Sequence, residues 1–189
     1  MSLAMTRSNQ EPRPPPKKSP ARSTIARMAQ GIRKVGIVGA GQMGNGIAHV
    51  CALAGIPVVL NDVAATRLKE ALATINGNMA RQVSRKRITE EDKTAALKRI
   101  STADSFDGLA DCDLVIEAAT EKEELKRKIF SELCPSLRPE TIVASNTSSI
   151  SITRLAAVTD RPEKFIGIHF MLNCPAATIT GDSLRTRRE

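Results

Sequence analysis

The 189-residue sequence contains no tryptophan, no tyrosine and only four phenylalanines. Aromatic packing therefore cannot dominate the interior, although 41% of the residues are hydrophobic and can fill a sizeable core. Aliphatic side chains must do most of the packing, as they do in parallel sheets that are covered by helices. The sequence also lacks an apolar run of about eighteen residues, so we expect no membrane-spanning helix and no membrane partner.

Histidine and cysteine, which are common ligands of transition metals, are scarce. The chain has two histidines and four cysteines. The cysteines, which are Cys51, Cys112, Cys134 and Cys174, are widely separated and form no C-x-x-C pair. We therefore expect no metal site, and we expect the reduced thiols that are usual in the cytoplasm.

Acidic residues are nearly missing from residues 1–34, where eight lysines and arginines face one glutamate and give a net charge of +7. The rest of the chain adds only +1 to the total of +8. Residues 1–31 are also rich in proline and serine, so we expect a disordered basic tail. The alternatives for this tail are a vector-derived leader, an extension before a natural start at Met28 and a segment that binds anionic surfaces weakly. Because the remainder is nearly neutral, we expect no specific nucleic-acid partner.

Short β-branched runs alternate with longer amphipathic stretches from residue 33 onward. Strands are predicted at 34–39, 57–62, 100–102, 112–118, 141–146 and 164–170. Helices are predicted at 43–55, 64–85, 89–100, 121–137 and 151–158, with a capping box formed by Thr89 and Asp92. Such alternation is typical of an α/β fold with a mostly parallel sheet, doubly wound by helices on both faces.

The segment GAGQMG at 39–44 is a G-x-G-x-x-G that follows the first predicted strand and opens the first predicted helix. Gly39 permits the tight turn, Gly41 leaves room for a pyrophosphate, and Gly44 lets the helix and strand pack closely. Gln42 and Met43 lie at the N-terminus of the helix, where free N–H groups attract phosphate. A turn with a purely structural role is the alternative. The coincidence of strand, motif and helix favours a Rossmann-type dinucleotide site.

Asp62 lies at the end of the second predicted strand, where dinucleotide-binding proteins carry an acidic residue. Its carboxylate can accept hydrogen bonds from the adenosine ribose and would repel a 2′-phosphate. We therefore expect the cofactor to be NAD rather than NADP.

Four segments, KVGIVGAGQMGNGIA, VIEAATEKEELKRKIF, ASNTSSISI and FIGIHFM, occur in this order. With them the sequence resembles the 3-hydroxyacyl-CoA dehydrogenase family, including bacterial 3-hydroxybutyryl-CoA dehydrogenases, over about residues 31–171. The resemblance implies that residues 32–171 form an NAD-binding Rossmann domain. It also implies a cytoplasmic enzyme that acts on acyl-CoA and that is a homodimer in the family.

The resemblance implies roles for individual residues. Glu121 and Lys126 would contact NAD after the fourth strand, and Asn173 would contact it near the end of the chain. Ser148 would lie beside the nicotinamide and hydrogen-bond the substrate oxygen. His169 would be the catalytic base, a role that suits histidine because its pKa lies near neutrality.

The predicted helical hairpin at about 64–100 resembles the extension that contacts coenzyme A in the family. Asn78 and Arg85 stand where the family places a polar and a basic residue, so the resemblance implies that both bind substrate. Arg85 can pair with a phosphate of coenzyme A.

Structural roles are the alternative for several of these residues. His169 can be a histidine of the core, and Glu121 and Lys126 can form an exposed surface pair of little energetic value. The SNTSS segment at 145–149 can be a loop that only caps the helix at 151–158.

The resemblance ends shortly after His169. Leu172 stands where the family has an asparagine, Asn173 is one place late, and Asp182 is a poor substitute for a glutamate that orients the histidine. We therefore interpret residues 172–189 as an atypical C-terminal segment without the family's helical domain, and a shift of reading frame would explain it.

These observations predict NAD-dependent oxidation of 3-hydroxyacyl-CoA, such as 3-hydroxybutyryl-CoA, to 3-oxoacyl-CoA in fatty-acid or butanoate metabolism. We expect NAD(H) binding together with impaired turnover. The alternative is a non-catalytic NAD-binding or regulatory module.

Overall fold

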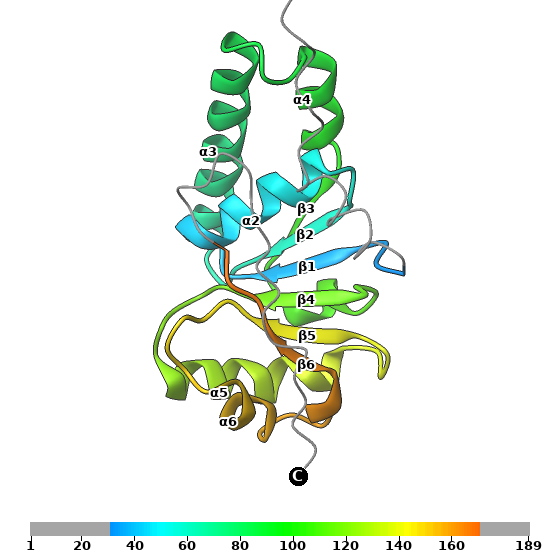
Figure 1. Ribbon diagram of the computed structural model, residues 1–189, viewed down its shortest axis with the longest axis vertical. Coiled ribbons are helices and arrows are strands. Elements are labelled where there is room, and N and C mark those ends of the chain that lie inside the picture. Colours follow the sequence, from blue (N-terminus) through cyan, green and yellow to red (C-terminus); the bar gives the residue numbers. More distant parts are fainter. Residues whose placement is uncertain (1–30, 171–189) are drawn as a thin grey trace, which may run out of the picture.

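A computed structural model of the protein describes residues 31–170. Six strands form one parallel sheet in the order β3-β2-β1-β4-β5-β6 (Figure 1). The strands are β1 (Val35–Val38), β2 (Val58–Asn61), β3 (Ile100–Ala103), β4 (Leu114–Glu117), β5 (Ile142–Ser145) and β6 (Phe165–Gly167). This is the strand order of doubly wound dinucleotide-binding sheets. The predicted Rossmann-type α/β fold is therefore confirmed.

Helices cover both faces of the sheet. They are α2 (Gln42–Leu53), α3 (Ala65–Ser84), α4 (Glu90–Leu97), α5 (Glu123–Leu133) and α6 (Ile152–Ala156), with 3-10 turns at Phe106–Leu109, Cys134–Ser136 and Pro162–Lys164. Alternate strand residues face opposite sides, so Ile37 packs with the helices α2 to α4. Val115 packs on the other face, with Phe130 of α5 and Leu155 of α6. The core is mainly aliphatic on both faces, as the shortage of aromatic residues predicts, although Phe130 and Phe165 pack edge to face in it.

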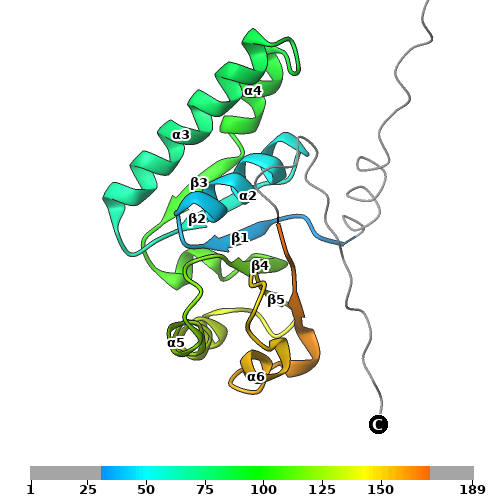
Figure 2. The ribbon, with the colours of Figure 1, turned by 60° about the vertical axis from the view of Figure 1, so that its left-hand side comes forward.

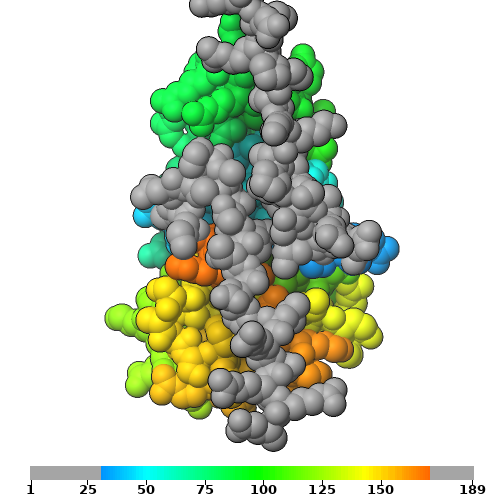
Figure 3. Space-filling view, in the orientation of Figure 1, coloured from blue at the N-terminus to red at the C-terminus, as the bar shows by residue number. Residues whose placement is uncertain are grey.

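The helices α3 and α4 form the predicted hairpin and project beyond the sheet (Figures 1 and 2). The backbone N–H of Asp92 donates to Thr89 Oγ1 at 3.1 Å, and the N–H of Thr89 donates to Asp92 Oδ2 at 3.0 Å. The predicted capping box is thus confirmed. In the space-filling view the hairpin makes one end of the molecule, and residues around α6 make the other (Figure 3).

Most predicted elements extend beyond the observed ones, and two of these differences have a clear physical cause. The sixth strand ends at Gly167 and not at 170, because its last partner is Ser145 at the end of β5. The helix predicted at 121–137 covers only Glu123–Leu133, after which Pro135 lies in a 3-10 turn. Proline has no N–H to donate, which ends the α-helical hydrogen bonding there.

Three predictions concern residues outside 31–170. They are the disordered tail at 1–31, of which only residue 31 is described, the atypical segment at 172–189 and the role of Asn173. Within the residues that the structure describes, no helix is long and apolar enough to cross a membrane.

Candidate active site

The turn between β1 and α2 requires two of its three glycines for steric reasons. Gly39 has a φ of +100°, and a Cβ there would lie 2.7 Å from the Cα of Ala119. A Cβ on Gly44 would lie 1.7 Å from the carbonyl oxygen of Gly39. A Cβ on Gly41, in contrast, would meet nothing within 4 Å. The open space in front of Gly41 is the space that a pyrophosphate needs.

The N-terminus of α2 faces this open space. Gly41 is the N-cap and offers no side chain to the free N–H groups of Gln42 and Met43. The first turn of the helix contains no acidic residue. The free N–H groups and the positive end of the helix dipole therefore favour an anion.

Asp62 is buried at the carboxyl end of β2 and holds the glycine turn in place. Its Oδ2 accepts the N–H of Ala40 at 2.9 Å, and its Oδ1 accepts the N–H of Ala64 at 3.0 Å. Each carboxylate oxygen has two lone pairs, so both oxygens keep capacity for a ribose hydroxyl. Asp62 thus connects the glycine turn after β1 to the segment that leads into α3.

A cleft of about 640 Å³ runs between α2 and α3. Gly41, Gln42 and Met43 line it together with Asn78 of α3 and Phe170. The structure therefore brings three predicted cofactor-binding residues and one predicted substrate-binding residue to one cleft. Asp62, Glu121, Ser148 and His169 do not line it.

A smaller pocket of about 240 Å³ adjoins the outer half of α3 and contains the predicted Arg85. Its lining is His49, Asn78, Arg81, Gln82, Arg85 and Arg87. Three guanidinium groups around one pocket favour a phosphate or another anion. Sequence reasoning missed Arg81 and Arg87, although RQVSRKR at 81–87 already shows the excess of positive charge.

His49 lines both the cleft and the smaller pocket. Its Nε2 lies 3.1 Å from the amide nitrogen of Gln82. Burial lowers the pKa of His49 below its ordinary value of 6.5, and the bond to Gln82 opposes this shift only in part. Burial therefore favours the neutral form of the His49 imidazole.

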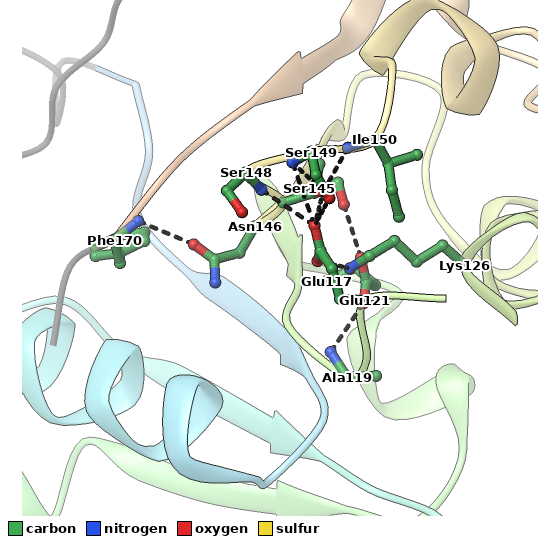
Figure 4. A network of polar contacts seen from close by, with 11 residues as sticks. Glu117, Ala119, Glu121, Lys126, Ser145, Asn146, Ser148, Ser149, Ile150 and Phe170 are labelled. Atoms are coloured by element: carbon green, nitrogen blue, oxygen red, sulfur yellow. Dashed lines mark hydrogen bonds and ion pairs between the residues drawn. The ribbon is translucent and has the colours of Figure 1, made fainter. Parts of the chain in front are cut away.

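Glu121 and Lys126 belong to a network of charges behind the carboxyl ends of β4 and β5 (Figure 4). Lys126 is only 1% exposed, and its Nζ lies 2.6 Å from Oε2 of the fully buried Glu117. The same ammonium lies 3.8 Å from Oε2 of Glu121. The alternative of an exposed surface pair is thus wrong for Lys126, whose charge is buried between two carboxylates.

Glu117 completes the network and was not foreseen. Its Oε2 accepts the hydroxyl of Ser145 at 2.8 Å, and its Oε1 accepts the N–H of Ala119 at 2.8 Å. The signal in the sequence was a glutamate that ends the apolar strand LVIE. An ionised carboxylate at such a position needs a buried cation as partner.

Ser148 and His169 are both exposed near the ends of neighbouring strands. Ser148 follows β5, and His169 lies two residues after β6. The side chain of Asn146 accepts the N–H of Phe170 at 2.9 Å, which fixes the backbone beside His169. Because the side chain of His169 is exposed, the alternative of a core histidine is wrong.

The SNTSS loop does have a structural role, but Ser148 does not carry it. Thr147 Oγ1 accepts the N–H of Ile150 at 3.1 Å, and α6 is capped by Ser151. Among the described residues, Ser148 takes part in hydrogen bonding only through its backbone N–H. Its hydroxyl points away from Glu121 in Figure 4 and is available to a ligand.

Comparison with known proteins identifies the family to which the chain belongs. Residues 34–179 match the family of the 3-hydroxyacyl-CoA dehydrogenase NAD binding domain, eight residues beyond the point at which the sequence motifs end. A 3-hydroxybutyryl-CoA dehydrogenase of Bradyrhizobium diazoefficiens is 73% identical over 148 residues, which are 78% of this chain and 50% of that protein. A 3-hydroxyadipyl-CoA dehydrogenase of Escherichia coli is 40% identical over 144 residues, 76% of this chain and 30% of that protein.

A solved structure shows the same relationship. The crystal structure of an (S)-3-hydroxybutyryl-CoA dehydrogenase from Ralstonia eutropha matches with a TM-score of 0.73 and 49% identity. The match covers 74% of this chain and 50% of that one. This chain thus spans about half the length of such relatives. It belongs to the 3-hydroxyacyl-CoA dehydrogenase family and corresponds to the NAD-binding domain of that family.

Proposed function

We propose that the protein binds NAD(H) and acts in the NAD-dependent oxidation of 3-hydroxyacyl-CoA, such as 3-hydroxybutyryl-CoA, to 3-oxoacyl-CoA. One observation carries this proposal. The glycine turn, with open space in front of Gly41, lies at the same edge of the sheet as Ser148 and His169. In open parallel sheets, ligands bind outside the carboxyl ends of the strands where the strand order reverses, here between β1 and β4.

The residues present fit the cofactor. The N–H groups at the start of α2 would hold the pyrophosphate, and Asp62 would accept hydrogen bonds from the adenosine ribose. Gly41 is the position at which a side chain would occupy the space of the phosphates. Bound NAD⁺ supplies the acceptor for the hydride that leaves C3 of the substrate.

His169 and Ser148 would supply the acid–base part of the reaction. Oxidation of the hydroxyl removes its proton, which an imidazole nitrogen of His169 would take. The hydroxyl of Ser148 would donate a hydrogen bond to the same substrate oxygen and stabilise its developing charge. Both side chains are exposed at neighbouring strand ends, where a substrate can reach them.

The α3–α4 hairpin would bind the coenzyme A part of the substrate. The cleft lined by Asn78 leads along α3 toward the pocket that contains Arg85. The guanidinium groups there suit the phosphates of coenzyme A. We propose that the protein acts in the cytoplasm, where NAD and acyl-CoA are both available, and cell fractionation would check this location.

Titration with NADH, followed by its fluorescence, tests the proposal. We expect saturable binding of NADH and at least about tenfold weaker binding of NADPH, because the carboxylate of Asp62 repels a 2′-phosphate. Gly41→Ala should weaken NADH binding at least about tenfold and leave the thermal midpoint unchanged, since its Cβ meets open space. A folded chain that takes up no NADH would contradict the proposal. Oxidation of NADH in the presence of acetoacetyl-CoA then tests the reaction.

A further inference from the structure

We propose that Glu121 is a positioning residue, whose carboxylate organises residues 147–149 so that Ser148 faces the reacting oxygen. We further propose that the buried pair Lys126–Glu117 fixes Glu121 in turn. The proposal rests on the role given to Ser148 above. It is additional to the NAD contact that the family resemblance implies for Glu121 and Lys126.

Donors from three consecutive residues converge on a single oxygen of Glu121 (Figure 4). Oε1 accepts the N–H of Ser148 at 3.2 Å, the N–H of Ser149 at 3.3 Å and the hydroxyl of Ser149 at 2.9 Å. The hydroxyl of Thr147 also donates to it. Successive N–H groups that point at one centre form a site for an anion. Here a carboxylate of the chain itself occupies that site.

The loop has few other anchors. Residues 147–149 lie between β5 and α6, and Ser148 and Ser149 are exposed. Besides Glu121, the described residues hold the loop only through Thr147 Oγ1, which accepts N–H groups from Ser149 at 3.4 Å and Ile150 at 3.1 Å. Thr147 belongs to the loop, so these bonds shape the loop without tying it to the sheet. Glu121 provides that tie.

Lys126 connects Glu121 to the interior of the sheet. The second oxygen of Glu121 faces the buried ammonium at 3.8 Å, and the ammonium is held at 2.6 Å by Glu117. Glu117 is fixed by two further donors, Ser145 and Ala119. A contiguous chain of polar contacts thus runs from the end of β4 to the backbone of Ser148. Burial raises the pKa of Glu121, but the hydrogen bonds from Thr147 and Ser149 and the charge of Lys126 together outweigh it and hold this pKa below its ordinary value of 4.5.

Such a support affects catalysis because a reacting group must be held within a fraction of an ångström. Oε1 of Glu121 is occupied by the loop, and Oε2 faces Lys126. Removal of the carboxylate should therefore release the loop first. Binding of the adenine half of the cofactor should persist, because it would depend on Gly41 and Asp62 at the β1–β2 side of the sheet.

The first test is amide hydrogen exchange in the 189-residue chain. Glu121→Ala should raise the exchange rates of the amides of Ser148 and Ser149 at least about tenfold relative to the amides of β1. Glu121→Gln keeps an acceptor without the charge and should have a smaller effect. Glu124→Ala, which removes an exposed carboxylate from the first turn of α5, should leave these rates unchanged. Unchanged exchange in Glu121→Ala would overturn the proposal.

The second test compares NADH binding in the same variants. A direct hydrogen bond from a charged group to the cofactor is worth about 1.5–3 kcal/mol, or about 10–150-fold in affinity. Because the resemblance also implies a contact of Glu121 with NAD, we expect Glu121→Ala to weaken NADH binding and, beyond that loss, to lower kcat with acetoacetyl-CoA when NADH is saturating. A loss of affinity of tenfold or more, with normal exchange at Ser148, would identify a direct contact and refute the positioning role. If the wild-type chain does not bind NADH, the proposed function fails, while the exchange test still decides the positioning role.

Glu117→Gln tests the deeper part of the chain of contacts. It removes the charge that holds Lys126 and keeps an acceptor for Ser145 and Ala119. We expect the amides of Ser148 and Ser149 to exchange about three to ten times faster relative to those of β1. If only global exchange rises, in equal proportion at β1, then Glu117 supports the fold alone.

Discussion

The strand order reverses between β1 and β4, and the loops on the two sides of this point are held in place by different means. On the β1–β2 side, glycines and the backbone define the site, since a Cβ at Gly39 or Gly44 would collide with main-chain atoms. On the β4–β5 side, charged side chains define it, and Glu117, Lys126 and Glu121 connect the sheet to the loop of Ser148. The first side depends on the absence of side chains and the second on their presence. Substitutions should therefore damage the two sides in different ways.

The largest effect is expected from Gly44→Ala. The new methyl carbon would lie 1.7 Å from the carbonyl oxygen of Gly39, and this backbone atom cannot move without opening the turn. We expect a loss of more than about 4 kcal/mol in the free energy of unfolding, which is a large fraction of the stability of a typical domain. Urea unfolding followed by circular dichroism would measure it.

A matched glycine provides the control for this substitution. A Cβ on Gly77, within α3, meets nothing within 4 Å. Because alanine is the better helix former, Gly77→Ala should stabilise the protein by up to about 1 kcal/mol. If Gly44→Ala were tolerated as well as Gly77→Ala, the steric account of the β1–β2 side would be wrong.

The second largest effect is expected from Lys126→Met, which leaves the carboxylate of Glu117 buried without its cation. Removing one partner of a buried ion pair lowers the free energy of unfolding by about 3–5 kcal/mol. The double variant Glu117→Gln/Lys126→Met removes both charges and keeps acceptors for Ser145 and Ala119. It should recover at least half of the loss in urea unfolding. Equal stability of the single and double variants would show that charge is not what organises the β4–β5 side.

The contrast between the two sides also explains what the sequence can predict. The glycine turn lies within six consecutive residues, and its steric requirements are local, so Gly39, Gly41 and Gly44 were identified from the sequence. The charge network joins residues that are far apart, such as Glu117 and Ser145, which are separated by 28 positions. Sequence reasoning assigned Glu121 and Lys126 through family resemblance alone, and it missed Glu117, which closes the network. A lysine in an amphipathic helix gives no sign that it is buried.

Element boundaries follow the same rule. The capping box at the start of α4 was predicted because Thr89 and Asp92 are three residues apart. The end of β6 was predicted three residues too late, because it depends on where β5 stops. The arginines around the smaller pocket were missed except for Arg85, since their grouping depends on how α3 ends. Local chemistry can be read from a sequence, whereas boundaries set by a partner element require the structure.

A moderate effect is expected from Thr89→Ala, which removes the N-cap of α4, a local feature that lies outside both sides of the candidate site. The substitution leaves the N–H of Asp92 without its acceptor at the start of α4. The loss should be about 1 kcal/mol of unfolding free energy. NADH affinity should not change, because the cap lies at the far end of the hairpin from the glycine turn. A change in that affinity would show that the hairpin and the cofactor site are coupled.

The smallest effect is expected from His49, a single titrating group between α2 and α3. Because burial lowers its folded pKa below the ordinary value of 6.5, the proton binds more tightly to the unfolded chain. Stability should therefore decrease as the pH falls below about 6.5 and level off below the folded pKa. His49→Gln should reduce this slope, as a glutamine does not titrate. Gln82→Leu removes the hydrogen bond that raises the pKa of His49, so it should deepen the decrease. Urea unfolding at several pH values would measure the three slopes. If His49→Gln kept the full slope of the wild type, the pH dependence would come from elsewhere and the contact between α2 and α3 would not depend on a neutral imidazole.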